Sequence, residues 1–157
     1  MRICFVCLGN ICRSPTAEGV FKHIVQARYP SAGITVESAG TAGYHVGARA
    51  DSRSRDVART RGYDLDSRAA QFRTEDFQRF DLVLAMDTEN LENLRAICPD
   101  EFNGELRLFR DFDPEAAPGA SVPDPYYGGP RGFEEVLDMC ERTSEAILQH
   151  LKEQGQL

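Results

Sequence analysis

The sequence predicts an α/β protein: a single three-layer domain in which a four-stranded parallel sheet has helices on both faces. Its 157 residues are enough to bury one good core. Short apolar runs typical of buried strands alternate with amphipathic helical segments along the chain. This alternation favours parallel strands joined by helical crossovers. We therefore expect one domain spanning residues 1–157.

The first unit is a strand followed by a helix. Residues 2–8 (RICFVCL) are almost continuously apolar, as in a parallel strand that is covered on both faces. Within the expected helix at residues 14–28, Pro15 suits the first turn. Apolar side chains then recur at helical spacing, at Ala17, Val20, Phe21, Ile24 and Val25.

The middle of the chain repeats this alternation. The expected elements are strands at residues 34–38, 80–86 and 105–109 and helices at residues 51–62 and 88–97. Gly62 is expected to end the first of these helices. Thr88 is the candidate N-cap of the second, which should end before Pro99.

The C-terminal part combines a long irregular segment with the clearest helix of the chain. Residues 111–132 (DFDPEAAPGASVPDPYYGGPRG) are rich in proline and glycine, and a connection of this length inside a domain is more often functional than idle. The stripe that predicts the helix consists of Phe133, Val136, Leu137, Cys140, Ile147, Leu148 and Leu151.

Composition excludes several classes of protein. The formal net charge of −7 disfavours nonspecific binding to nucleic acid or membranes. No segment resembles a signal peptide or a membrane-spanning helix, so we expect a cytoplasmic protein with no membrane insertion. Five cysteines at irregular spacing favour reduced thiols over a disulfide framework, with Cys4, Cys98 and Cys140 in the core.

The loop CLGNICRS, residues 7–14, lies between the first strand and the first helix. Ligands of open α/β sheets bind at the carboxyl ends of the strands, and a helix N-terminus there attracts anions. Gly9 and Asn10 allow the backbone to curl so that successive N–H groups form a nest for phosphate. Arg13 grips phosphate oxygens, and Cys7 is a nucleophile that Arg13, the helix end and Ser14 draw toward the thiolate.

Other readings of these cysteines are weaker. The loop lacks the Gly-Lys-Ser/Thr ending of a nucleotide-binding P-loop. Cys4 and Cys7 lie three residues apart on a strand, so they point to opposite faces and do not form a redox pair. A zinc site needs four clustered ligands, whereas the cysteines and histidines here are scattered. His45 is expected near the site, on the loop surface and not as a catalytic residue, and Asp87 either caps the following helix or supports the site.

The chain resembles the low-molecular-weight protein tyrosine phosphatases. The resemblance rests on CLGNICRSPTAE from Cys7 onward, SAGT at residues 38–41 and DPYYGG at residues 124–129, and it covers essentially the whole chain. It implies that Cys7 attacks phosphorus and forms a phosphocysteine, while Asp124 protonates the leaving phenolate and then activates water. The expected product is inorganic phosphate, released from a tyrosine-phosphorylated protein.

The resemblance also implies how the phosphoryl group is held. Its oxygens would be bound by the Arg13 side chain and by the backbone N–H groups of Leu8, Gly9, Asn10, Ile11, Cys12 and Arg13. Ser14 would bond the thiolate, and Asn10 and Ser38 would hold the loop. No metal or cofactor is expected, since arginine and N–H groups carry the charge.

Substrate specificity would come from an aromatic slot. Tyr44 and Tyr126 would sandwich a phenyl ring, with Leu8 lining the slot, and phosphoserine would be too short to reach the thiol. Many relatives have prolines after the first aromatic, whereas this chain has GARADSRS, which leaves the shape of that loop open.

Three alternatives to a tyrosine phosphatase stay open. Arsenate reductases of this fold need further cysteines well after the loop, and residues 70–97 contain none. Phosphoarginine phosphatases of this fold usually carry threonine where this chain has Ile11. The third alternative, an inactive phosphate- or phosphopeptide-binding module, is weakened because Cys7, Arg13 and Asp124 are all present.

Overall fold

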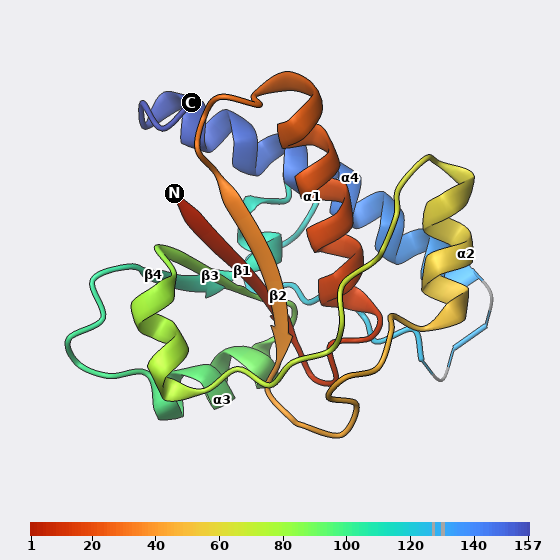
Figure 1. Ribbon diagram of the computed structural model, residues 1–157, viewed down its shortest axis with the longest axis horizontal. Coiled ribbons are helices and arrows are strands. Elements are labelled where there is room, and N and C mark those ends of the chain that lie inside the picture. Colours follow the sequence, from red (N-terminus) through yellow and green to blue (C-terminus); the bar gives the residue numbers. More distant parts are fainter. Residues whose placement is uncertain (127, 130) are drawn as a thin grey trace.

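Strands and helices alternate along the chain in the computed structural model, which describes residues 1–126, 128, 129 and 131–157 (Figure 1). Tyr127, part of the DPYYGG motif, therefore lies outside the described residues. The strands are β1 (Arg2–Cys7), β2 (Thr35–Gly40), β3 (Leu82–Ala85) and β4 (Glu105–Leu108). The α-helices are α1 (Arg13–Arg28), α2 (Ser52–Thr60), α3 (Thr88–Ile97) and α4 (Arg131–Glu153), and the 3-10 helices are η1 (Thr74–Arg79) and η2 (Phe109–Phe112).

The four strands form one parallel sheet in the order β2-β1-β3-β4. The chain first crosses from β1 to β2 on one side and then returns to place β3 on the other side of β1. A crevice forms beside the carboxyl end of β1 because the connections leave it in opposite directions. Cys7 is the last residue of this strand and lies opposite Gly40 of β2.

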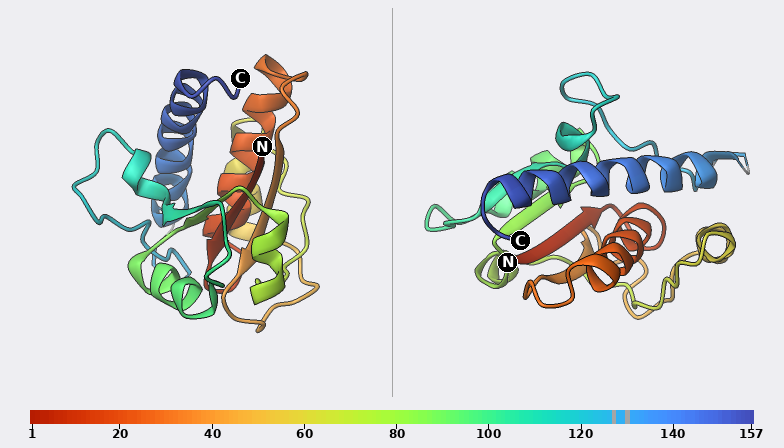
Figure 2. Two further views of the ribbon diagram at one scale, coloured as in Figure 1. Left: turned by 90° about the vertical axis from the view of Figure 1, so that its left-hand side faces the viewer. Right: turned by 90° about the horizontal axis from the view of Figure 1, so that it is seen from above.

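Helices cover both faces of the sheet, as the sequence predicted (Figure 2). Ile3, Phe5 and Cys7 of β1 face one core, to which α1 and α4 contribute. Cys4 and Val6 face the other core, to which α3 and η1 contribute. Cys4 and Cys7 therefore point to opposite faces, as their spacing on a strand requires.

The predicted helices are all present, with changes at their ends. The stripe predicted for the last helix is buried in α4 from Phe133 to Leu151. The prediction that Thr88 caps α3 is wrong, because Asp87 is the N-cap and its carboxylate accepts a hydrogen bond from the Asn90 N–H. Cys98, predicted to be in the core, is only half buried against it. The two 3-10 helices were not predicted.

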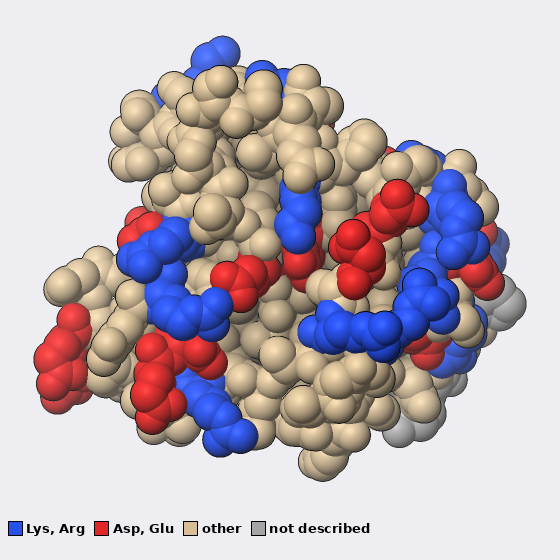
Figure 3. All heavy atoms as spheres, in the orientation of Figure 1, with Lys and Arg blue, Asp and Glu red and all other residues tan. Residues whose placement is uncertain are grey.

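Charges of both signs are interspersed on the surface, and lysine and arginine side chains form a row beside α2 at the lower right of Figure 3. Arg49, Arg55 and Arg59 line a hollow together with Asp64 and Asp66. In the described part of the chain, no helix has the length and apolar character needed to cross a bilayer.

Candidate active site

The loop between β1 and α1 curls around the sulfur of Cys7. Asn10 makes this possible by adopting a left-handed conformation with φ of 58°, which asparagine tolerates better than most residues. The backbone N–H of Asn10 then points back at Cys7, with N and Sγ 3.3 Å apart. The loop is also tied to the segment after β2, because the Thr41 and Ala42 N–H groups donate to the Cys7 and Leu8 carbonyls.

Gly40, at the end of β2, allows this close approach. A Cβ atom placed on Gly40 would lie 2.7 Å from the Leu8 carbonyl oxygen and 3.2 Å from the Asn10 nitrogen. Real Cβ atoms essentially never come as close to backbone atoms as the shorter of these distances. The glycine of the SAGT motif is therefore required by space between two backbone segments.

Cys7 is almost completely buried and sits among donors. Ser14 Oγ lies 3.0 Å from Cys7 Sγ, and the N-terminus of α1 begins at Arg13 in the same loop. Hydroxyl and N–H groups at these positions, together with the positive end of a helix, suit a sulfur that carries negative charge.

A second layer of side chains holds the loop from behind. The Asn10 amide nitrogen donates to Ser14 Oγ at 2.8 Å and to Ser38 Oγ at 2.9 Å. Its oxygen accepts a hydrogen bond from the Ala70 N–H at 3.0 Å. Asn10 and Ser14 are therefore buried behind the loop, where they shape it without lining the cleft.

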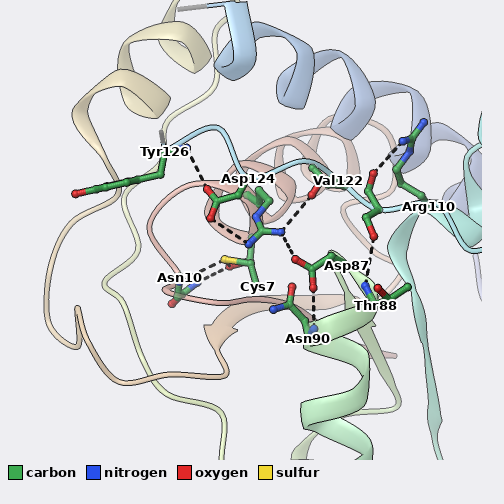
Figure 4. A network of polar contacts seen from close by, with 12 residues as sticks. Cys7, Asn10, Asp87, Thr88, Asn90, Arg110, Val122, Asp124 and Tyr126 are labelled. Carbon is green, nitrogen blue, oxygen red and sulfur yellow. Dashed lines mark hydrogen bonds and ion pairs between the residues drawn. The ribbon is translucent and has the colours of Figure 1, made fainter. Parts of the chain in front are cut away.

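Arg13 is a buried residue of the cleft, and two hydrogen-bond acceptors and one ion-pair partner from other segments hold its guanidinium. Figure 4 shows Asp87, Val122 and Asp124 around one point above Cys7. The Arg13 Nη1 atom donates to Asp87 Oδ2 at 2.6 Å and to the Val122 carbonyl at 3.2 Å, while Nη2 lies 3.7 Å from Asp124 Oδ2. Burial lowers the pKa of Arg13, but the Cys7 and Asp87 charges raise it, and the net direction is upward.

Asp124 lies at the edge of this group. Its side chain is 41% exposed, and its Oδ1 accepts a hydrogen bond from the Tyr126 N–H at 3.0 Å (Figure 4). One carboxylate oxygen therefore faces Arg13 while the other fixes the turn that carries Tyr126. Pro123 and Pro125 flank Asp124 and restrict the backbone around it.

A cleft of about 340 Å³ opens above the sulfur. Its lining residues are Cys7, Leu8, Gly9, Ile11, Cys12, Arg13, Tyr44, His45, Asp124 and Tyr126. The structure thus brings together the predicted residues of the loop, the aromatic rim and the late acidic segment. Tyr44 is highly exposed on the rim, whereas Tyr126 is more covered.

Two further residues bear on the cleft: His45 lines it, and Arg53 lies outside its lining but contacts Tyr126. His45 was expected near the slot as a loop-surface residue and not as a catalytic one; it lines the cleft, and a Cβ on Gly9 would lie 3.0 Å from its Cδ2 atom. Arg53 of α2 braces Tyr126, because its guanidinium lies 5.2 Å from the centre of the Tyr126 ring and donates to the Tyr126 carbonyl. No local sequence pattern points to Arg53, since 73 residues separate it from Tyr126.

Cys12 is a second buried thiol in the loop. Burial, with help from the nearby Asp51 charge, raises its pKa to about 12. Cys12 therefore stays protonated near neutral pH. In the described residues, no three His, Cys, Asp or Glu side chains are grouped as metal ligands.

Comparisons with known proteins agree with this geometry. The family model described as low molecular weight phosphotyrosine protein phosphatase matches residues 2–157. A low molecular weight protein-tyrosine-phosphatase of Streptomyces coelicolor is 48% identical, with 98% of this chain and 94% of that protein covered.

Solved structures show the same fold. A protein tyrosine phosphatase of Entamoeba histolytica superposes with a TM-score of 0.91 at 42% identity, over 100% of this chain and 99% of that one. A Drosophila arginine phosphatase superposes with a TM-score of 0.87 at 29% identity, over 97% and 98% of the two chains. From the family match and the identity over nearly its whole length, the chain belongs to the low molecular weight phosphotyrosine protein phosphatase family.

Proposed function

We propose that the protein hydrolyses phosphotyrosine in protein substrates, with Cys7 as nucleophile, Arg13 as phosphate ligand and Asp124 as proton donor. The observation that carries this proposal is a buried sulfur that lines the same cleft as the Arg13 guanidinium and the Asp124 carboxylate. These are the groups that a two-step displacement at phosphorus requires.

In the first step, the Cys7 thiolate attacks phosphorus and the bond from phosphorus to the tyrosine oxygen breaks. Asp124 gives its proton to the leaving oxygen, which matters because a phenol has a pKa of about 10. In the second step, water attacks phosphorus, Asp124 takes up a proton from that water, and the phosphorus–sulfur bond breaks. Inorganic phosphate leaves and the Cys7 thiolate is regenerated.

The phosphoryl oxygens would be bound by the N–H groups of the loop from Leu8 to Arg13 and by the Arg13 side chain. Asp87 supports this role because it fixes one side of the guanidinium at 2.6 Å and is itself fixed as the N-cap of α3. Arginine and helix N–H groups can supply the positive charge that many phosphatases obtain from metal ions.

Phosphotyrosine is proposed as the substrate rather than phosphoarginine, although a Drosophila arginine phosphatase shares the fold. Ile11 lines the cleft and has no hydroxyl to bond a guanidinium near phosphorus. Tyr44 and Tyr126 offer faces for the flat ring of tyrosine. We also propose a cytoplasmic location, because the reaction needs Cys7 as a free thiol and the cytoplasm keeps thiols reduced.

The test is hydrolysis of an aryl phosphate in the presence of a chelator, with the Cys7→Ser variant as the comparison. We expect turnover by the parent protein and none by the variant, while the variant still binds inorganic phosphate. Phosphate binding without turnover by the parent protein would instead indicate a binding module.

A further inference from the structure

A buried carboxylate that the proposed reaction does not use lies behind the loop. Glu18, in the second turn of α1, has a side chain that is only 7% exposed. Its Oε1 accepts a hydrogen bond from Ser38 Oγ at 2.5 Å, and its Oε2 pairs with Lys22 Nζ at 3.0 Å. Glu18 and Lys22 line a polar hollow of about 220 Å³ that is separate from the cleft above Cys7.

A continuous chain of hydrogen bonds joins Glu18 to the sulfur of Cys7. It runs from Glu18 to Ser38, from Ser38 to Asn10, from Asn10 to Ser14 and from Ser14 to Cys7, and every link is between 2.5 and 3.0 Å. Charged side chains face both ends of the chain. They are Lys22, Asp64 and Asp66 around the hollow and Arg13 and Asp124 at the cleft.

The direction of these bonds follows from counting protons. A carboxylate can only accept, so Ser38 gives its single hydroxyl proton to Glu18. Ser38 Oγ is then an acceptor for one N–H of the Asn10 amide, and Ser14 Oγ is the acceptor for the other. Because Ser14 accepts from Asn10, its own proton is available for Cys7 Sγ at 3.0 Å, with the Ala39 carbonyl as a longer alternative at 3.4 Å.

The opposite direction is chemically possible if the Asn10 amide turns over. Its oxygen would then accept the protons of both Ser14 and Ser38, and Ser14 would have no proton left for the sulfur. Two contacts oppose that turn. The Ala70 N–H donates to the Asn10 amide oxygen and would lose this acceptor if the amide turned. The Glu18 carboxylate is also a stronger acceptor for the Ser38 proton than the Asn10 amide oxygen would be.

We propose that Glu18 is a positioning residue for the phosphatase reaction: its negative charge sets the direction of the hydrogen-bond chain so that Ser14 donates to the Cys7 thiolate. Glu18 touches neither substrate nor sulfur and acts through Ser38, Asn10 and Ser14. The inference rests on the proposed role of Cys7 as a thiolate nucleophile, but it can be tested without turnover.

The Glu18→Gln variant tests the direction because Lys22 selects how the introduced amide lies. Lys22 can only donate, so it holds the oxygen of the introduced amide and turns the amide nitrogen toward Ser38. Ser38 then accepts from that nitrogen and loses the acceptor for its own proton, and a turned Asn10 amide would offer that proton a new acceptor, so the turned amide is favoured. We expect the pH midpoint of Cys7 alkylation by iodoacetamide to rise by about one unit, the size of one hydrogen bond to a charged group.

A simple charge effect predicts the opposite sign. Removing a negative charge near a thiolate stabilises the thiolate, so the midpoint would fall. Lys22→Met added to Glu18→Gln separates the two explanations further. Without Lys22, the introduced amide can turn its oxygen to Ser38 and restore the direction, so the midpoint should return toward that of the parent protein, whereas loss of a positive charge alone would move it higher.

The matched control is Glu37→Gln. Glu37 is the exposed neighbour of Ser38 on β2 and pairs with Arg79, so this variant loses the same charge without touching the chain of bonds. We expect no change in its alkylation midpoint. In Glu18→Gln we also expect kcat for an aryl phosphate to fall about 10-fold, with little change in the inhibition constant of inorganic phosphate.

A Glu18→Gln midpoint that is unchanged or lower, in a protein that still unfolds cooperatively, would overturn the proposal. So would the absence of recovery in the double variant. Should Glu18→Gln fail to fold, Ser38→Ala removes the same link from the other side, and an unchanged midpoint there would count equally against it. Because alkylation needs no substrate, a failure of hydrolysis in the parent protein would refute the proposed function separately.

Discussion

Replacing Asp113 with asparagine should weaken the attachment of the segment that leads to Asp124. Asp113 has no exposed side-chain surface, and Arg142 of α4 donates to both of its oxygens at 2.7 and 2.9 Å. Arg110 also pairs with Asp113 at 3.0 Å and donates to the Ser121 carbonyl at 2.9 Å. The Asp113 carboxylate therefore holds the start of the segment between η2 and Val122 directly, and it holds the end of that segment through Arg110.

The size of the effect follows from the pKa of Asp113. Hydrogen bonds from Arg142 lower it most, burial opposes them, and the Glu115 N–H and Arg110 lower it further, to about 2 from an ordinary value of 3.8. At about 1.4 kcal/mol per pKa unit, the ionised form contributes about 2 kcal/mol to the free energy of unfolding at neutral pH.

The sign of the pH dependence is fixed by the direction of that shift. The unfolded chain binds this proton more tightly than the folded protein, so the contribution is complete above the unfolded pKa of 3.8 and is lost as the pH falls through about 2. The difference in stability between the parent protein and Asp113→Asn should therefore shrink by about 1 kcal/mol between pH 7 and pH 3.

Urea unfolding at both pH values measures this difference. The matched control is Asp111→Asn, which removes the same charge from an exposed neighbour and should change stability by less than about 0.5 kcal/mol. A loss in Asp113→Asn that is equal at pH 7 and pH 3 would show that the carboxylate charge is not the cause.

Three further predictions concern the cleft. Asp124→Asn should slow hydrolysis of tyrosine-like phosphates by about 10²- to 10⁴-fold and should slow hydrolysis of esters of acidic phenols less. Measuring kcat for leaving groups of different pKa tests this prediction. A loss that is the same for every leaving group would exclude Asp124 as the proton donor. After mild peroxide treatment, Cys12 should trap oxidised Cys7 as a disulfide. The disulfide should form faster at higher pH because the pKa of Cys12 is about 12. Peptide mapping should find Cys7 over-oxidised more readily in Cys12→Ser than in the parent protein. The parent protein should cleave phosphotyrosine faster than phosphoarginine. Ile11→Thr should raise kcat/KM for phosphoarginine relative to that for phosphotyrosine, because an unpaired guanidinium N–H costs about 1 to 3 kcal/mol. Faster cleavage of phosphoarginine by the parent protein would contradict the assignment.

Local sequence patterns predicted much of the fold and part of the site. Hydrophobic spacing predicted the strand–helix alternation, because β1 and α4 are buried along regular patterns that a short window reveals. Cys7 and Arg13 could be paired because a single tight loop holds both. Asp124 and the aromatic rim came from the family resemblance, since nothing local links them to the loop.

The remaining contacts depend on how distant segments meet. Asp87 was ambiguous because its partner Arg13 is 74 residues away and becomes a neighbour only when β3 pairs with β1. The burial of Glu18 could not be predicted because a helical glutamate is usually solvated, and its hydrogen-bond partner Ser38 lies on β2. The sequence offered both Asp87 and Thr88 as the cap of α3 because they are adjacent and both are good caps, and the structure selects Asp87.

The absence of a side chain at Gly40, a residue outside the loop, determines how closely the loop approaches β2. Gly40 contributes no side chain to the cleft, yet the Leu8 carbonyl and the Asn10 nitrogen occupy the space that a Cβ atom on Gly40 would need. Its φ is not in the left-handed region, so alanine would act through crowding and not through backbone strain. A methyl group there would force the Leu8 carbonyl or the Asn10 nitrogen to move, so the geometry of the nest depends on a residue outside it, while every anion-binding residue keeps its identity.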